Sequence, residues 1–252
     1  MKSIRRVFME QDHGDEKEFR WRGGDVSRIE SISDAVFAFS LTLVVLSTQV
    51  PRSWEELRLL FYELPAFATC FALISWLWLI HYYYFRRFGL EDRITITLNG
   101  FLLFSVLAYV FPLKYLATGI ISVQILGAKE LGTSMPRDSG ALMIFYSVGF
   151  TVIFLCFTLL YLHAWRQRDS FELNAPERSI TRGALRAHAA MVLVGGVSLI
   201  LTQVSQVWAG LVFFAIGPIQ GILGWRNGVR VDREFREWKQ SQPEVSGEPG
   251  PH

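Results

Sequence analysis

Six long apolar runs, separated by short and mostly basic polar segments, make up most of this chain of 252 residues. About 20 helical residues span the hydrocarbon core of a bilayer, and each run approaches or exceeds that length. The pattern therefore predicts an all-α membrane protein with six transmembrane helices. The expected spans are 28–51, which starts with a polar third, and then 66–84, 94–115, 140–165, 184–201 and 207–225.

The segments between the runs predict smaller features. Ser53 and Glu56 have the spacing of a capping box, so a short interfacial helix is expected to run to about Tyr62. Pro65 suits the first position of the second span. The apolar segment 116–126 either extends the third helix or lies at the membrane surface.

Lys and Arg are distributed unevenly between alternate connections. If the N-terminal arm is cytoplasmic, the opposite side of the membrane carries only Arg52, Arg58, Lys114, Lys129 and Arg137. An excess of Lys and Arg marks cytoplasmic segments, so both termini are expected in the cytoplasm of a multi-pass plasma-membrane protein. The expected regions are a cytoplasmic N-terminal arm (1–27), a six-span domain (28–230) and a cytoplasmic tail (231–252), largely disordered because it becomes rich in Pro, Gly and Ser.

Composition and motifs exclude several classes of protein. The net charge of +2 gives no reason to expect nucleic acid as a partner. Cys70 and Cys156 lie singly in apolar runs, so neither a disulfide nor a metal site is expected. No Walker, GxSxG, HExxH or GxGxxG motif is present, so we expect no enzyme and no cofactor. The TVGYG filter of carbonyl-lined potassium channels is also missing.

One face of the first span is apolar. Phe39, Leu43, Leu46 and Val50 share this face, and Thr42 borders it. Such a stripe is usually a packing surface between helices. The alternative is a pore wall, in which large apolar side chains gate ions by dewetting and nearby hydroxyls contribute to selectivity.

Four polar residues are expected at one depth near the cytoplasmic side: Arg28, Asp34, His81 and Asn99. Singly, His81 would be a hydrogen-bonded core residue and Asn99 an interhelical contact. Together they can form a satisfied network that fixes three helices. Ser33 and Ser40 belong to a seven-residue repeat of small residues that would permit close helix approach.

These residues carry a family resemblance. Arg28, Ile32, Ser33 and Asp34 resemble the RxxxFSD helix of the transmembrane protein 175 family of potassium channels. Trp78 and His81 are similar to the Trp/His pair of the family's second span. Leu98-Asn99 and Phe111-Pro112 are similar to its LN…LP pattern in the third span.

The resemblance implies a homotetramer in which the first helix of each subunit lines a pore that conducts K+. It places the constriction at Phe39, Leu43 and Leu46, and a selectivity layer of hydroxyls at Thr42. It assigns Arg28, Ser33, Asp34, Trp78, His81 and Asn99 to the motif and its polar network. The sequence departs from the family at Ile32, where the motif has Phe, and at Phe39, where the constriction is usually aliphatic.

We therefore predict a potassium-selective cation channel in a lipid bilayer, with permeant K+ but no fixed metal. A secondary transporter is a second hypothesis, for which Gly195-Gly196 and Gly217-Pro218 are the candidate helix breaks. A non-conducting membrane interaction protein is a third.

Overall fold

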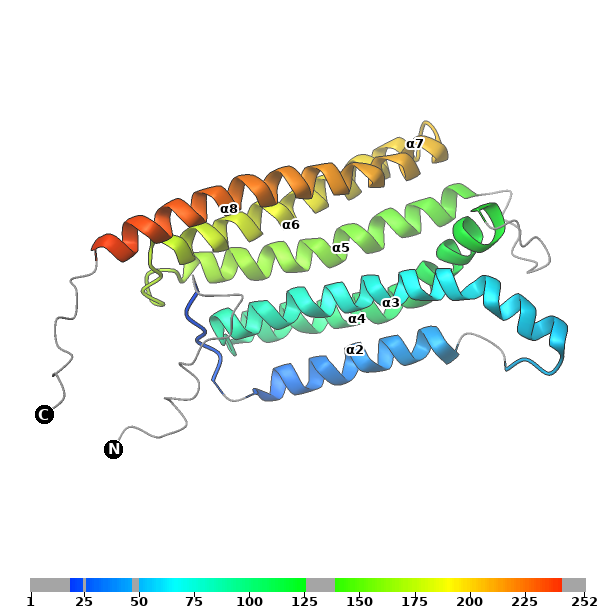
Figure 1. The fold of residues 1–252 in the computed structure, drawn as a ribbon, viewed down its shortest axis with the longest axis horizontal. Coiled ribbons are helices and arrows are strands. Elements are labelled where there is room, and N and C mark those ends of the chain that lie inside the picture. The colour runs from blue at the N-terminus through cyan, green and yellow to red at the C-terminus, as the bar shows by residue number, and fades with distance from the viewer. Residues whose placement is uncertain (1–18, 25, 47–49, 126–138, 242–252) are drawn as a thin grey trace, which may run out of the picture.

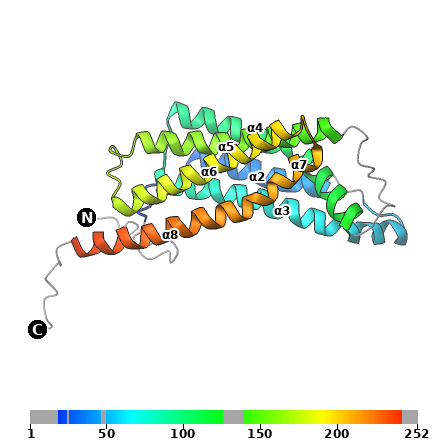
Figure 2. The same ribbon diagram turned by 90° about the horizontal axis from the view of Figure 1, so that it is seen from above.

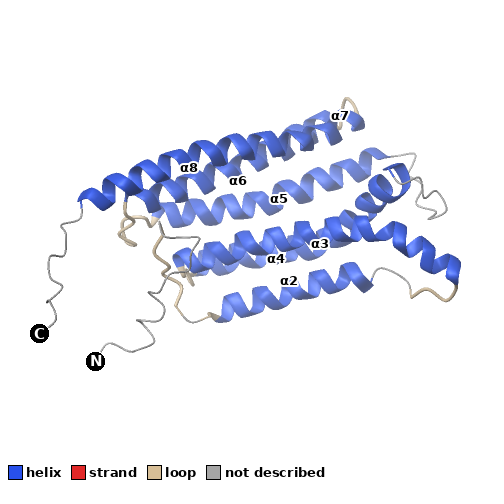
Figure 3. Ribbon diagram, viewed as in Figure 1, coloured by secondary structure: helices blue, strands red, loops and turns tan. Residues whose placement is uncertain are grey.

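The structure, a computed structural model, describes residues 19–24, 26–46, 50–125 and 139–241, and every regular element in these ranges is a helix (Figures 1 and 3). Six of the helical segments are long and apolar enough to cross a membrane, which confirms the predicted all-α, six-span fold. The elements are α2 (Arg28–Leu46), α3 (Trp54–Phe88), α4 (Arg93–Ala117), a π-helical segment η1 (Thr118–Ile125), α5 (Ser139–Arg166), α6 (Ala175–Leu201), α7 (Gln206–Leu211), a 3₁₀ segment η3 (Val212–Ala215) and α8 (Ile216–Ser241).

The long helices lie side by side in one elongated bundle. In Figure 1, α2 forms one edge, α3 and α4 follow, then α5, and α6 with α8 forms the opposite edge. The view from above shows α8 running beside α6 over much of its length (Figure 2). Helix α2 begins and α8 ends at the same end of the bundle. Because α2 and α8 form opposite edges of the bundle, the two helices are separated by the full width of the subunit.

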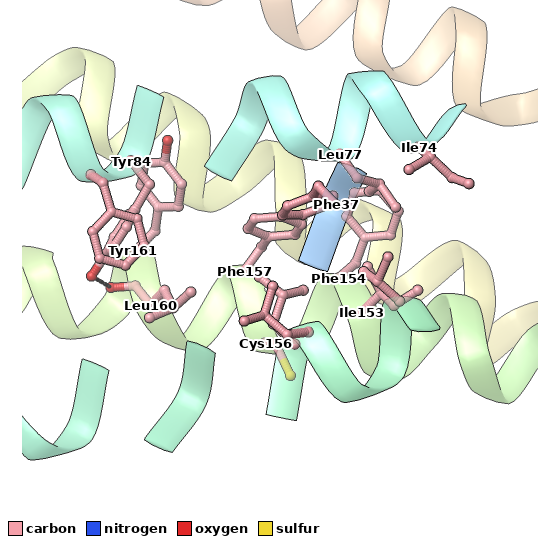
Figure 4. Packing of buried hydrophobic residues seen from close by; sticks show 14 of the residues in the cluster. Phe37, Ile74, Leu77, Tyr84, Ile153, Phe154, Cys156, Phe157, Leu160 and Tyr161 are labelled. Carbon is pink, nitrogen blue, oxygen red and sulfur yellow. Dashed lines mark hydrogen bonds between the residues drawn. The ribbon is translucent and has the colours of Figure 1, made fainter. Parts of the chain in front are cut away.

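An aromatic core lies between α2, α3 and α5 (Figure 4). Phe37, Tyr84, Phe157 and Tyr161 are almost completely buried. The Tyr84 hydroxyl donates a hydrogen bond to the carbonyl oxygen of Leu160 at 3.2 Å, so its polar end is satisfied inside the bundle. This core fixes one face of α2 against the rest of the subunit.

The second span is longer than the sequence indicated. Helix α3 runs without a break from Trp54 to Phe88, so the separate interfacial helix predicted to end near Tyr62 is wrong. Pro65 lies inside this helix, where it removes a single backbone donor. The α3 ribbon bends between its beginning and its middle (Figure 1). Ser53 does cap the helix by accepting from the Glu56 N–H, whereas the Glu56 carboxylate accepts from the N–H of Arg52.

Two further boundaries are settled by the structure. The apolar segment after α4 continues the helix as η1, which is one of the two alternatives left open by the sequence. Residues 231–241 belong to α8, although a largely disordered tail was expected from residue 231. Arg, Glu, Lys and Gln dominate this part of α8, and all are good helix formers. Residues 1–18, 126–138 and 242–252, with Ser47, lie outside the described residues.

Candidate functional site

The buried face of α2 combines polar and apolar residues. Glu30, Ser33, Phe37, Ser40 and Val44 are buried, at spacings of three and four residues that place them on one side of the helix. The hydroxyls of Ser33 and Ser40 donate to the carbonyl oxygens four residues earlier, at 2.7 and 2.8 Å. Because these side chains are short and internally satisfied, α3 and α4 can approach α2 closely.

A buried polar chain joins the first three helices. The Asn99 amide nitrogen on α4 donates to the Ser33 hydroxyl oxygen at 2.8 Å. The Asn99 amide oxygen accepts from His81 Nε2 on α3 at 3.0 Å, which requires the imidazole tautomer protonated at Nε2. The His81 ring also packs against Phe37 and Phe85, with centroid separations of 5.5 and 4.6 Å. The chain fixes the rotation of α2 about its axis, because only one rotation presents Ser33 to Asn99.

A second link between α2 and α3 lies at the surface of the subunit. The indole N–H of Trp78 donates to an Asp34 carboxylate oxygen at 2.8 Å, and both residues are exposed. The structure thus brings together five of the six residues assigned to the motif and network. The sixth, Arg28, is exposed and forms no hydrogen bond or ion pair within the described part of the chain.

Glu30 lies near the network, although this residue was not identified from the sequence. Its backbone N–H donates to the Ser27 hydroxyl at 3.1 Å, and its carboxylate accepts from the Ser27 N–H at 2.9 Å. The carboxylate also lies 3.9 Å from Arg86 at the end of α3. The S-x-x-E spacing of a capping box was the available signal. Glu30 therefore both starts α2 and ties it to α3.

The opposite face of α2 is exposed and apolar. Phe39 is 54% exposed and Leu46 is 69% exposed, and Thr42 is exposed between them. The Thr42 hydroxyl donates to the Ala38 carbonyl oxygen at 2.9 Å, and its lone pairs accept no hydrogen bond from the described residues. Leu43 lies at the margin, half-buried against the core. The residues predicted to form a pore constriction thus face away from their own subunit, except Leu43.

The segment before α2 is anchored to the far half of the chain. Arg22 forms a two-pronged ion pair with Glu177 on α6, with N–O distances of 3.0 and 2.8 Å, and the Arg20 N–H donates to the same carboxylate at 2.9 Å. The N–H groups of Arg22 and Gly23 donate to the Arg86 carbonyl. A Cβ at Gly23 would lie 2.7 Å from the Phe85 carbonyl oxygen, so only glycine fits there. These contacts, which the sequence did not predict, fix the segment that precedes α2.

Asp92, between α3 and α4, links the first helices to α5. Its carboxylate caps α4 by accepting from the Thr95 N–H and also accepts from His163 and Gln167. Partial burial alone would raise the pKa of Asp92, but the hydrogen bonds to its charged form outweigh this effect and lower that pKa to about 2. Within the described residues, no group of three or more His, Cys, Asp and Glu side chains could hold a metal ion.

The chain is similar to known potassium channels. Residues 28–110 match the protein family described as "Endosomal/lysosomal potassium channel TMEM175". A protein of Marivirga tractuosa named "Potassium channel" is 35% identical over 235 residues, which cover 88% of this chain and 95% of that protein.

Two solved structures share the fold. The crystal structure of the T38A variant of the potassium channel MtTMEM175, bound to a nanobody–MBP fusion protein, matches with a TM-score of 0.73 at 35% identity. The match covers 83% of this chain and 97% of that one. The crystal structure of a lysosomal potassium-selective channel TMEM175 homolog from Chamaesiphon minutus matches with a TM-score of 0.53 at 25% identity, over 79% and 96% of the two chains.

Proposed function

Because the chain belongs to the TMEM175 family of potassium channels, we propose that it conducts K+ through a pore lined by α2 from each of four identical subunits. The pore has no carbonyl filter of the TVGYG type. Its constriction is apolar, at Phe39 and Leu46 with Leu43 at the margin, and Thr42 supplies the hydroxyl layer. The protein acts without a cofactor and has no enzymatic activity, and K+ is its permeant ion.

The observation that carries this proposal is the exposed apolar face of α2 at one edge of the bundle. No described element of the subunit covers Phe39 or Leu46. Large apolar side chains exposed in a row mark an interaction surface or contact with lipid. The buried polar chain fixes the rotation of α2 about its axis, so that the exposed apolar face lies at the edge of the subunit. A helix held in this way is suited to line a symmetry axis.

The chemistry of this face suits a gate with weak selectivity. A ring of phenyl groups at Phe39 offers no ligand to a dehydrated cation, so a narrow ring excludes water and ions until it widens. The lone pairs of the exposed Thr42 hydroxyl can replace part of the hydration shell of a passing ion. K+ gives up its water more readily than Na+, so a hydroxyl layer favours K+.

The charge distribution supports both termini in the cytoplasm of a plasma membrane. Arg86, Arg87, Arg166 and Arg168 lie at helix ends that share one end of the bundle with the start of α2 and the end of α8 (Figure 1). Excess Lys and Arg on one side of a membrane marks the cytoplasmic side.

The decisive experiment is planar-bilayer recording of the purified protein under a K+ gradient. Its mass in detergent, measured by light scattering, should correspond to four chains of 28.8 kDa. We expect K+ current that grows with driving force and does not saturate at low K+ concentration. A confirmed tetramer without K+ current under any gating condition contradicts the proposal. Saturating flux would instead favour the transporter hypothesis.

A further inference from the structure

Four arginines gather around two hollows at the end of the bundle where α8 ends. A groove of about 200 Å³ between α6 and α8 is lined by Gly183, Arg186, Leu223, Arg226, Asn227 and Arg230. An adjoining hollow of about 260 Å³ on α8 shares Arg226 and Arg230 and adds Trp225, Val229 and Arg233. The channel function proposed above uses none of these residues.

None of the arginines in this cluster is ion-paired with a carboxylate of the described residues. Arg186, Arg226, Arg230 and Arg233 are exposed and form no ion pair with any acidic residue in the described ranges. Other arginines at this end of the bundle do have such partners, as Arg22 has Glu177. Unpaired guanidinium groups that converge on a concave surface form a site for an anion, and their planar forks suit phosphate.

The packing of α6 against α8 sets the shape of the groove. A Cβ at Gly183 would lie 2.3 Å from the Asn227 side chain, so the missing side chain on α6 lets Asn227 of α8 fit closely there. Two turns along α8, the Gln220 amide donates to the Ala187 carbonyl oxygen at 3.0 Å and joins the same helices. The arginines therefore project from a fixed pair of helices.

The length of the apolar helical segment before Arg226 indicates that the cluster lies at the depth of the lipid headgroups. Residues 206–225 are 20 helical residues, and a helix of this length is about as long as the hydrocarbon core is thick. Arg226 follows directly, and Trp225, 74% exposed, is the aromatic residue typical of the membrane interface. Ile222, one turn deeper, is also exposed. Apolar side chains thus lie immediately below the arginines on the outer surface of α8.

We propose that this cluster binds the phosphate of an anionic phospholipid of the cytoplasmic leaflet, with an acyl chain along Ile222 and Trp225. The leaflet assignment rests on the membrane orientation proposed above. Basic pockets between transmembrane helices on the cytoplasmic side suit anionic headgroups. Helix α8 lies at the edge of the bundle opposite α2 (Figure 1), so lipid reaches the site while α2 lines the pore.

The test is native mass spectrometry of the full-length protein titrated with phosphatidylglycerol and, in parallel, phosphatidylcholine. The wild type should retain phosphatidylglycerol preferentially. The R186Q/R226Q double variant should bind it about thirtyfold more weakly, because both arginines line the groove and each contributes about 1 kcal/mol of attraction to anionic lipid. The matched control is R93Q/R236Q, which also removes two exposed arginines at this end and should change binding by less than about twofold.

Three outcomes overturn the inference: no preference in the wild type, an equal loss in both double variants, or equally tight binding of glycerol 3-phosphate, which has the phosphate but no acyl chains. Potassium flux in phosphatidylcholine liposomes separates this result from the channel proposal. Flux without lipid preference contradicts the lipid site alone. Lipid preference without flux contradicts the channel alone. Melting curves of all variants confirm that they are folded.

Discussion

The two faces of α2 differ from those of a helix in a water-soluble protein, because several polar residues are buried and large apolar residues are exposed. Its buried face holds the polar residues Glu30, Ser33 and Ser40 together with Phe37 and Val44, and its exposed face holds the apolar residues Phe39 and Leu46. In water, the apolar stripe of an amphipathic helix turns inward and polar residues turn outward. The exposed apolar residues indicate that lipid or further subunits surround the helix, and the buried polar groups serve as contacts between helices.

The faces also differ in how they are constrained. Each hydroxyl on the buried face has a defined partner, and Ser33 belongs to a chain that crosses three helices. On the exposed face, the apolar side chains have no hydrogen-bond partner among the described residues, and the Ser31 and Thr42 hydroxyls form only local bonds to carbonyl oxygens four residues earlier. Substitutions on the buried face should therefore change stability, and substitutions on the exposed face should change conduction.

The largest effect is expected for Ser33→Leu. The bulkier side chain has no room beside Asn99 and leaves the Asn99 amide without its acceptor. Overpacking costs about 1–3 kcal/mol and an unsatisfied buried donor about as much again. We expect loss of the folded assembly in size-exclusion chromatography and a strongly lowered melting temperature. Ser31→Leu is the matched control, because Ser31 is exposed on the same helix. Equal melting of both variants would contradict the difference between the faces.

Phe39→Ala should alter conduction while leaving the fold intact. Removing the phenyl ring widens the apolar constriction, so single-channel K+ conductance in planar bilayers should rise several-fold. The control is Val45→Ala, at a residue exposed to 53% compared with 54% for Phe39 but about 120° away around the helix. Unchanged conductance in Phe39→Ala, or the same rise in both variants, would identify Phe39 as a packing residue.

Much of the fold could be predicted because its signal is local. Run length predicts six spans, since the hydrocarbon thickness sets a minimum number of residues. Helix boundaries were harder to predict from the sequence. Proline starts helices far more often than it lies inside them, so a boundary at Pro65 was the natural prediction, and only the structure shows that α3 passes through it. The helical part of 231–241 was missed because the Pro and Gly beyond it dominated the composition.

The candidate site divides in the same way. Ser33, Asp34, Trp78, His81 and Asn99 were named from a motif, and the structure adds which of them touch. Arg28 was named with them, yet it has no partner in the described residues. The pair between Arg22 and Glu177 joins positions 155 apart in sequence and leaves no periodic or local pattern. Contacts of this kind are set by tertiary packing and could not be predicted from one sequence.

A smaller effect is expected for Trp78→Phe. The substitution keeps an aromatic ring but removes the N–H that donates to Asp34. Interhelical hydrogen bonds of membrane proteins contribute about 0.6 kcal/mol on average, and Asp34 remains accessible to water. Thermal unfolding should shift slightly to lower temperature. Trp76→Phe is the control, because Trp76 is similarly exposed, 39% against 36%, and forms no hydrogen bond with a described residue. Equal shifts would mean that the link to Asp34 contributes nothing.

The smallest effect concerns Asp92, which joins α4 to α5 away from both faces of α2. Its pKa falls from 3.8 to about 2 on folding, so its contribution to stability is present above pH 4 and is lost as the pH falls towards 2. Because its side chain is 37% exposed, we expect the loss to be below about 1 kcal/mol. Melting temperatures measured between pH 5 and pH 2.5 should decline less in Asp92→Asn than in the wild type.

The increase in conductance caused by Phe39→Ala should be the same with or without Asp92→Asn, because the carboxylate supports the bundle and contacts neither face of α2. If Phe39→Ala raised the conductance by a different factor when Asp92→Asn is also present, the α4–α5 junction would control the orientation of α2.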